Sequence, residues 1–277
     1  MLRGFYTAAS GMLAQQRKTE MLANNMSNAN TPGFKADQSA IRAFPEMLLQ
    51  RMDKGNGVTP GSSRTIGSLN TGVYMQEVMP KFLQGDLKET GLKTDVALLD
   101  VSLPTNPETG MVGSTFFTVE GNDGGRRYTR NGNFTLDGAG FLTTGSGAYV
   151  LDQQGNRIGL PSDQFVVNDE GQIIVGFDEN QEVVARIGIA YTNDPHSMVK
   201  EGDGLFRFEG GNLADAYNVD GLFVKTQQGF LEQSNVDTAQ TMTEMMAAYR
   251  TFEANQKVLQ AYDTSLQKTV NEVGRIG

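Results

Sequence analysis

The feature that most constrains the fold is a long apolar repeat near the end of the chain. Between Met242 and Val273, positions at alternating spacings of three and four residues are apolar at eight of ten places, and neither proline nor glycine interrupts them. A helix over residues 235–273 would be roughly 57 Å long, which exceeds the usual helix of a compact domain. The repeat therefore predicts a coiled-coil-like helix that needs a partner along its length.

A second apolar stripe lies at the other end of the chain. Residues 2–30 carry apolar side chains at six of eight heptad-spaced positions, and Pro32 with Gly33 ends the helical pattern. The economical arrangement packs the two terminal helices on each other as a stalk, although both could instead cover the rest of the protein. Because the C-terminal stripe is the longer one, part of it should remain available to neighbouring subunits.

The region between these stripes predicts a β-rich domain. Residues 36–80 indicate a linker or extended segment, with helical spacing at residues 41–52, whereas residues 81–230 alternate with period two between frequent Gly and Asp turns. Asn131-Gly132 predicts a hairpin between the runs on either side of it, and residues 137–140 predict another turn. The fold class is therefore α+β, an antiparallel β-rich domain flanked by terminal helices, with predicted divisions 1–35, 36–80, 81–230 and 231–277.

Composition argues against several classes of function. The formal net charge is −9, which does not suit a nucleic-acid binder, and the basic residues Arg126, Arg127 and Arg130 are interpreted as a solvated hairpin edge. The absence of cysteine excludes disulfides and thiolate metal sites. No apolar run reaches the roughly 20 residues of a transmembrane helix, and residues 1–6 do not form a convincing cleaved signal.

Candidate chemical residues have simpler structural interpretations. The single histidine, His196, lies in a predicted turn without a nucleophile-elbow motif. The acid pairs at 169–170 and 178–179 resemble the carboxylates of a glycosidase, and residues 218–221 resemble part of a calcium loop, but all three lie in predicted turns. We therefore predict no catalytic residue, no cofactor and no metal, and we expect that the protein is not an enzyme.

Five sequence boxes occur in a fixed order along the chain. They are Asn-Thr-Pro-Gly-Phe-Lys at 30–35 after a run of asparagines, Gln-Gly-Asp-Leu-Lys-Glu-Thr-Gly at 84–91, Tyr-Thr-Arg-Asn-Gly-Asn-Phe at 128–134, Gly-Phe-Leu-Glu-Gln-Ser-Asn-Val-Asp at 229–237 and Tyr-Arg-Thr-Phe-Glu-Ala-Asn-Gln-Lys-Val at 249–258. Together they resemble the signatures of the flagellar hook–basal body, or distal-rod, protein family, and most resemble the rod-like proteins of Gram-positive bacilli. A longer stretch at 100–114, expected to be a loop, departs from the family pattern.

This resemblance implies a structural subunit of the bacterial flagellar basal body, required for flagellum assembly and motility. It implies export through the flagellar type III apparatus without a cleaved signal, a location outside the cytoplasmic membrane, and a helical homo-oligomer that meets other rod and hook proteins. It implies that the boxes serve assembly. The alternative is a non-flagellar exported adhesin or phage-tail-like protein with a coiled-coil stalk. No nucleic acid, small-molecule substrate or transmembrane segment is expected.

The two stripes and the boxes together give a predicted assembly interface. Its residues are Leu2, Phe5, Met12, Asn24, Asn25, Met26, Met242, Met245, Tyr249, Phe252, Leu259, Leu266 and Val270. Since these stripes gain full cover only from many neighbours, the isolated subunit is expected to be mostly monomeric with poorly ordered ends.

Overall fold

The computed structural model describes residues 2–52, 63–107, 110–121, 123–176 and 182–273, and it has the α+β class expected from the sequence. Two compact units share the chain. Unit 1 contains residues 1–26, 37–79 and 237–277, and unit 2 contains residues 27–36 and 80–236. Each unit is built from segments that are far apart in the sequence, so neither can close before its distant segments have met.

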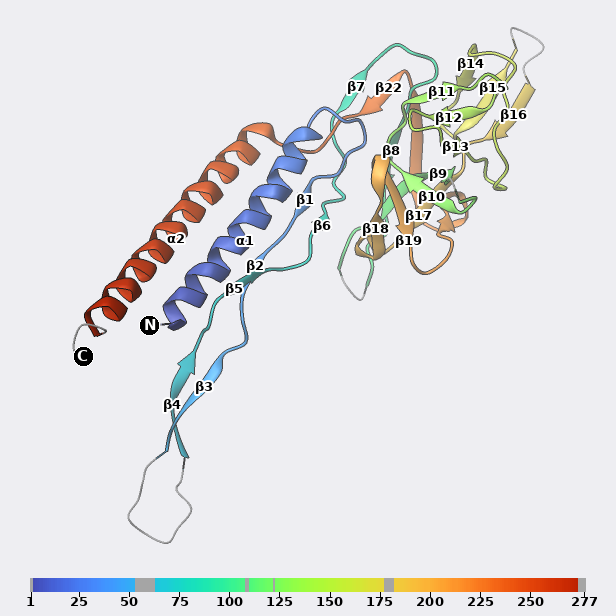
Figure 1. Cartoon of the computed structure of the whole chain (residues 1–277). Coiled ribbons are helices and arrows are strands. Elements are labelled where there is room, and N and C mark those ends of the chain that lie inside the picture. Colours follow the sequence, from blue (N-terminus) through green and yellow to red (C-terminus); the bar gives the residue numbers. More distant parts are fainter. Residues whose placement is uncertain (1, 53–62, 108–109, 122, 177–181, 274–277) are drawn as a thin grey trace. The chain divides into compact units, whose positions relative to one another are not determined.

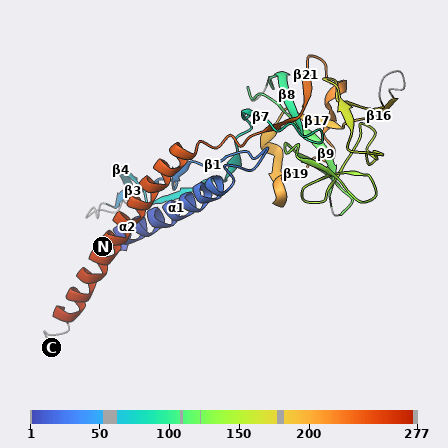
Figure 2. The same cartoon turned by 90° about the horizontal axis from the view of Figure 1, so that it is seen from above.

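The two long helices both belong to unit 1 and run antiparallel. Helix α1 spans Leu2–Ser27 and α2 spans Thr238–Val273, and the views in Figures 1 and 2 show them side by side. A Cβ on Gly4 would meet the ring of Tyr262, and one on Gly11 would lie 3.0 Å from the Asn255 side chain. Positions early in α1 therefore face positions late in α2.

Small residues on α1 allow this close approach. Gly4, Ala8 and Gly11 are spaced four and three residues apart, so they lie along one line of the helix. The other face of α1 meets the extended part of unit 1, because the Ser10 hydroxyl accepts a hydrogen bond from Val73 N at 3.3 Å. Thr7 Oγ1 likewise donates to the Thr71 carbonyl at 3.4 Å.

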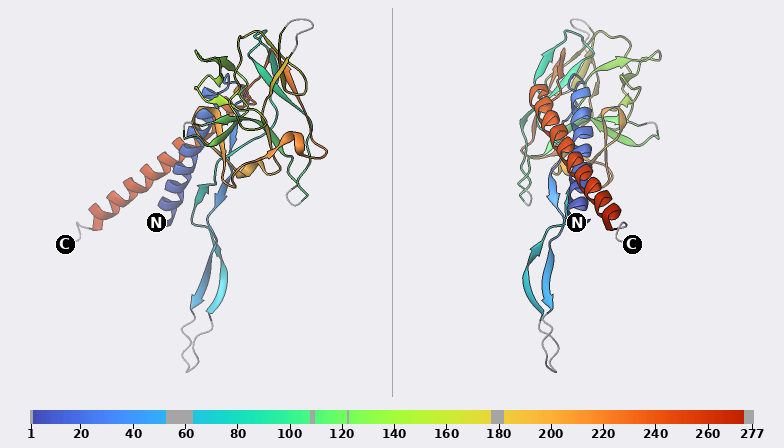
Figure 3. Two further views of the ribbon diagram at one scale, coloured as in Figure 1. Left: turned by 90° about the vertical axis from the view of Figure 1, so that its right-hand side faces the viewer. Right: turned by 60° about the vertical axis from the view of Figure 1, so that its left-hand side comes forward.

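An extended two-stranded ribbon completes unit 1, in the region where the sequence indicates a linker or extended segment. Its strands are β1 (Asp37–Gln38), β2 (Ile41–Ala43), β3 (Met47–Met52), β4 (Ser63–Leu69) and β5 (Val73–Met75). β2 pairs with β5 and β3 with β4, both antiparallel, and Figure 3 shows β3 beside β4. The alternative of a short helix at 41–52, which the helical spacing there left open, is therefore wrong. The residues of this segment instead form β2 and β3, and their pairing with β5 and β4 outweighs the helical spacing of the apolar residues.

Unit 2 consists of short strands whose pairs are antiparallel. The strands are β7 (Leu87–Glu89), β8 (Val96–Ser102), β9 (Ser114–Glu120), β10 (Arg126–Thr129), β11 (Phe134–Leu136), β12 (Leu142–Thr144), β13 (Tyr149–Val150), β14 (Phe165–Val167), β15 (Gln172–Val175), β16 (Glu182–Arg186), β17 (Ile189–Thr192), β18 (Met198–Lys200), β19 (Leu205–Phe208), β20 (Ala214–Asp215), β21 (Phe223–Gln228) and β22 (Phe230–Glu232), and β6 (Met79–Pro80) precedes them. A nine-stranded sheet runs β11-β12-β13-β9-β10-β19-β18, with β17 joined to β9 and β20. Smaller groups are β14-β15-β16, β21-β8 and β22-β7.

Strand β9 is the centre of the hydrophobic core of unit 2. Its residues are buried from Ser114 to Val119. Phe117 belongs to the larger core cluster, with its ring edge against Phe134 at a centroid distance of 5.1 Å, whereas Phe116 belongs to a second cluster. Both faces of this strand are therefore covered, which explains its continuous apolar run in place of an alternating pattern. The loop expected at 100–114 begins only after Ser102, because β8 continues to that residue.

One turn design recurs in the hairpins of unit 2. Asp137, Asp152 and Asn168 each begin a turn in which their own carbonyl accepts from the amide of a glycine three residues later. Each side-chain Oδ1 also accepts from the amide four residues on, at 2.8, 2.7 and 2.9 Å. These glycines have φ between +77° and +91°, which glycine adopts without steric cost. The turn predicted at 137–140 is thus confirmed, and it joins β11 to β12.

The hairpin predicted at Asn131-Gly132 is wrong. The strand before it, β10, pairs with β9 and β19, whereas the strand after it, β11, pairs with β12. Gly132 instead lets two chain segments approach closely, since a Cβ there would lie 1.7 Å from the Val96 carbonyl oxygen. Val96 N donates to the Gly132 carbonyl at 3.0 Å. The glycine is required by a neighbouring strand rather than by a tight turn.

The start of α2 differs slightly from the sequence prediction. The predicted helix begins at residue 235, whereas α2 begins at Thr238 with Asp237 as its N-cap. Asp237 Oδ1 accepts from Gln240 N at 2.9 Å, the usual N-cap bond to the third helical amide. Ser234 Oγ accepts from Val236 N at 3.3 Å, which is a local turn before the helix.

Candidate assembly surfaces and a buried charge cluster

The predicted interface residues of α1 have mixed environments. Leu2 is the first residue of the helix, Phe5, Met12 and Met26 are half-buried, and Asn24 is exposed. Asn25 is buried, where its side chain accepts from Asp37 N and donates to Asp37 O, both at 2.8 Å. Asn25 therefore holds the start of the extended ribbon against α1.

The predicted stripe on α2 is divided between two faces. Met245, Phe252, Leu259 and Leu266 are half-buried, whereas Met242, Tyr249 and Val270 are 54%, 56% and 69% exposed. Thr241 and Ala248 are buried, and Asn255 and Tyr262 face α1. The seam toward α1 thus uses 241, 245, 248, 252, 255, 259, 262 and 266, which is also a heptad. Three of the seven predicted positions on α2, namely Met242, Tyr249 and Val270, lie outside this seam.

An apolar groove lies beside that seam. Its volume is about 280 Å³, and its lining is Thr19 from α1 with Met245, Met246, Tyr249 and Arg250 from α2. The exposed side chains of Met242, Met246 and Tyr249 follow one line of α2 over two turns. We call these three residues the α2 ridge. Methionine side chains adapt to irregular partners, so this surface suits helix contacts.

A buried charge cluster lies in unit 2. Its members are Lys35, Asp100, Arg130 and Glu232, and Lys35, Arg130 and Glu232 have side chains that are 3% exposed or less. Glu232 is its centre. Oε1 accepts from Lys35 Nζ at 2.5 Å and Oε2 from Arg130 Nε at 2.8 Å. Arg130 Nη2 lies 3.0 Å from Asp100 Oδ2, so two cations meet two carboxylates.

Burial and neighbouring charges shift the pKa values in this cluster. Burial, reinforced by the nearby charge of Arg130, lowers the pKa of Lys35 to about 8, although Glu232 opposes the change. Burial alone would raise the pKa of Glu232. The charges of Arg130 and Lys35 outweigh that effect and hold the pKa of Glu232 below its ordinary value. Lys35, Arg130 and Glu232 are therefore ionised near neutral pH, and their mutual contacts offset the cost of burying these charges.

Four of the five sequence boxes meet around this cluster. Gly85 N donates to Glu232 Oε1 at 2.8 Å, and Gly33 N donates to the Glu232 carbonyl at 2.8 Å. Asn235 accepts from Ala36 N at 2.7 Å and donates to the Lys81 carbonyl at 2.7 Å. The boxes at 30–35, 84–91, 128–134 and 229–237 therefore tie distant parts of unit 2 together. Their polar residues make internal contacts, a role that the sequence alone did not indicate.

Arg130 corrects the interpretation of the basic residues as a solvated edge. Arg126 is exposed and Arg127 forms ion pairs with Asp123 and Glu201, as a solvated edge would allow. Arg130 instead is buried and donates to the Thr115 carbonyl at 2.9 Å. The sequence feature that could have indicated its burial is its place inside the box at 128–134, directly after Tyr128 and Thr129.

The residues considered for chemistry are not gathered into a site. His196 is exposed in a short 3-10 helix, η2 (Pro195–Ser197), two others being η3 (Gly202–Gly204) and η4 (Ala216–Asn218), and Asp169 and Glu170 lie in a turn. The acids at 178–179 fall outside the described residues. Among the residues that the structure describes, no group of three or more acidic or histidine side chains is placed to hold a metal, and neither long helix is apolar enough to cross a bilayer.

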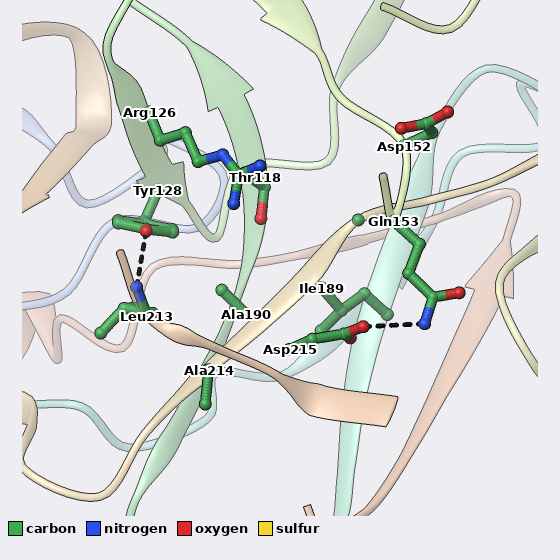
Figure 4. A pocket seen from close by; sticks show the side chains of 11 residues that line it. Thr118, Arg126, Tyr128, Asp152, Gln153, Ile189, Ala190, Leu213, Ala214 and Asp215 are labelled. Atoms are coloured by element: carbon green, nitrogen blue, oxygen red, sulfur yellow. Dashed lines mark hydrogen bonds between the residues drawn. The ribbon is translucent and has the colours of Figure 1, made fainter. Parts of the chain in front are cut away.

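A small polar pocket lies beside β17 in unit 2 (Figure 4). Its volume is about 40 Å³, enough for a few water molecules but not for a substrate. Gln153 donates to Asp215 at 2.7 Å, and Tyr128 Oη accepts from Leu213 N at 2.9 Å. These two bonds join polar groups within the lining, and the Asp152 carboxylate is bonded to Asn156 outside it.

Three family profiles match this chain along its length. They are the flagella basal body rod protein profile at residues 5–35, the flagellar hook protein FlgE/F/G D1 domain at 111–175, and the flagellar basal body rod FlgEFG protein C-terminal profile at 227–272. The first and third cover most of α1 and α2, and the second covers part of the β-rich unit.

Curated relatives match over essentially the whole chain. The flagellar hook-basal body complex protein FlhO of Bacillus subtilis is 43% identical over 278 residues and covers 100% of both chains. The flagellar basal-body rod protein FlgG of the same organism is 32% identical, covering 98% of this chain and 99% of the relative. FlgF of Caulobacter vibrioides is 30% identical over 100% of both chains. This chain therefore belongs to the flagellar hook–basal body rod protein family.

Proposed function

We propose that this chain is a structural subunit of the flagellar basal-body rod that polymerises through its terminal helices and is needed for flagellum assembly and motility. The names of its relatives describe rod and hook–basal body proteins, which favours this role over an exported adhesin. We propose no catalytic activity, and we place the protein in the basal body, outside the cytoplasmic membrane after type III export.

The observation that carries the proposal is the exposed α2 ridge on a helix pair that has little core of its own. Met242 and Tyr249 are more than half exposed, and α1 adds Tyr6 and Leu13, which are 63% and 56% exposed and seven residues apart. Exposed apolar stripes on both helices are typical of surfaces that other subunits cover. Helices from neighbouring copies would bury these stripes in a coiled-coil-like stalk.

The uncovered end of α2 supports the same reading. Since Gly4 faces Tyr262, the residues of α2 after about 264 extend past the start of α1. Val270, at 69% exposure, is in this overhang. A head-to-tail series of such overhangs can build an open helical filament, with copies of this chain and other rod and hook proteins as partners. The proposed functional division is 1–35 and 231–277 for the stalk, 81–230 for the β-rich domain and 36–80 for the connection.

The test replaces Met242 and Tyr249 together by serine in the full chain. We expect a folded protein that no longer incorporates into the rod and leaves cells non-motile, because the substitution removes apolar contacts between subunits but few within one. The matched control replaces Val166 and Val183, which are 54% and 53% exposed in unit 2, by serine and should incorporate normally. Normal incorporation of the Met242→Ser/Tyr249→Ser protein would rule out the α2 ridge as an assembly surface.

A further inference from the structure

The charge cluster collects side chains from four separate parts of the chain. Lys35 and Glu232 are 197 residues apart, and Arg130 and Glu232 are 102 residues apart. Asp100 is in β8 and Glu232 is the last residue of β22. The two positive and two negative charges balance only when all four segments are in place.

Glu232 is the member of the cluster nearest the C-terminus. Without it, the cluster would carry one excess positive charge. Without it, Arg130 would keep Asp100 as its partner. Lys35 would keep the Leu83 carbonyl, to which it donates at 2.7 Å, but would lose the carboxylate with which it forms its ion pair. A buried ammonium group without its carboxylate strongly destabilises the fold around it.

The cluster is also joined to the central strand of the core. Arg130 donates from Nη1 to the carbonyl and the hydroxyl of Thr115 in β9, at 2.9 and 2.8 Å. Thr115 in turn donates to Asp100. A charge imbalance here therefore acts on β8 and β9, which carry the core of unit 2, and not only on the short β22–β7 pair.

We propose that the charge cluster makes folding of the whole β-rich unit conditional on Glu232, so that a chain supplied N-terminus first stays open until β22 arrives. Lys35 and Arg130 are cations that both need the carboxylate of Glu232, which lies far along the chain, as an ion-pair partner. The strands from β8 to β21 contain most of the apolar core, yet they gain full stability only after the last segment neutralises Lys35.

One consequence concerns passage through a narrow channel. A unit that closes only when residue 232 is available would not form a bulky domain while its first 230 residues are being threaded. This consequence rests on the proposed function, including export, whereas the dependence of folding on Glu232 does not. Measurements on the purified full chain therefore test the folding device separately from rod incorporation.

The experiment compares hydrogen exchange of the full chain with that of three variants. Glu232→Gln keeps the shape of the side chain but removes the charge, and Lys35→Met/Glu232→Gln removes one charge of each sign, so that Arg130 and Asp100 remain balanced. The matched control is Glu120→Gln, which removes a carboxylate of β9 that pairs with Arg157 at the surface at 2.6 Å.

In Glu232→Gln, the amides of β9 should exchange about 100-fold faster or more, because the imbalance destabilises the whole unit. Lys35→Met/Glu232→Gln should recover at least about tenfold of that protection, and Glu120→Gln should stay within about threefold of the wild type. If Glu232→Gln does not fold at all, folding of the double variant sustains the proposal. Faster exchange confined to β7 and β22, or a double variant no better protected than Glu232→Gln, would overturn it.

Discussion

Units 1 and 2 differ in how completely they bury their apolar side chains. Both hydrophobic core clusters lie in unit 2, where large side chains such as Phe116, Phe117 and Tyr128 are almost completely covered. Among the described residues of unit 1, the buried apolar ones are few and mostly small, such as Ala8, Ala14 and Ala248. Unit 2 therefore has the means to be stable by itself, whereas unit 1 presents long helices whose apolar residues are only partly covered.

The two units therefore use their characteristic residues for different purposes, unit 2 for its own folding and, in the proposed function, unit 1 for assembly. Polar box residues that resemble a family signature are used inside unit 2, where they hold its own segments together. Apolar residues of the helices remain exposed in unit 1, where further copies can cover them. Substitutions in the two units should consequently have different signatures, one on stability and one on incorporation.

The largest effect is expected from the core of unit 2. Phe117→Ala should lower the free energy of unfolding by about 3–5 kcal/mol, because the removed ring leaves a cavity against Phe134. Urea titration followed by near-ultraviolet circular dichroism measures this loss. The control Val166→Ala removes methyl groups from an exposed residue and should change stability by less than about 0.5 kcal/mol. Equal losses in the two variants would contradict the placement of the core.

A smaller effect concerns pH and the charge cluster. The pKa of Lys35 is about 8 in the folded protein and 10.5 as its ordinary value, so between these pH values the unfolded chain holds a proton that the folded chain lacks. The stability of unit 2 should therefore rise with pH in this window, by roughly 3 kcal/mol in total.

Urea midpoints at pH 7 and pH 10 measure this rise, with Lys35→Met as the reference. The variant lacks the titrating group. Its free energy of unfolding should therefore increase less between pH 7 and pH 10 than that of the wild type. The same pH dependence in both proteins would show that Lys35 keeps its ordinary pKa. On the acid side the slope has the same sign, since the lowered pKa of Glu232 gives stability that is lost as the pH falls.

The smallest effect concerns the helix pair of unit 1, where the sign of a stability change shows whether α1 and α2 are in contact. Gly11→Leu would place a large side chain where even a Cβ lies 3.0 Å from Asn255, so overpacking should destabilise the pair by about 1–3 kcal/mol. In an uncontacted helix the same change would stabilise it by about 1 kcal/mol through helix propensity. Far-ultraviolet circular dichroism during thermal unfolding reads the sign. Gly67→Ala, a site with no neighbour within 4 Å of an added Cβ, is the control.

The sequence predicts the parts of this fold that local chemistry determines. Periodicity gives both terminal helices, with ends within about three residues of those observed, and Asp or Asn followed by Gly gives hairpin turns such as that at Asp137. The family resemblance follows from five boxes in order, and the family profiles and the relatives confirm it.

Non-local contacts explain what the sequence does not predict. Asn131-Gly132 has the pattern of a hairpin, but the Val96 carbonyl beside it, rather than a turn, requires the glycine. Arg130 has the pattern of a surface charge, but its partners Asp100 and Glu232 are distant in sequence. The apolar stripe of α2 does not by itself identify the seam toward α1, because the small residues of α1 that determine this contact give no apolar signal. The role of each predicted interface residue in assembly remains a prediction.

Hydrogen exchange of the same protein before and after assembly tests the central claim most directly. In a proven monomer, the amides of α1 and α2 should exchange at least about 100-fold faster than those of β9, and assembly should slow the helices while leaving β9 unchanged. Helices as well protected as β9 in the monomer would contradict the account, because unit 1 would then be complete without neighbouring copies.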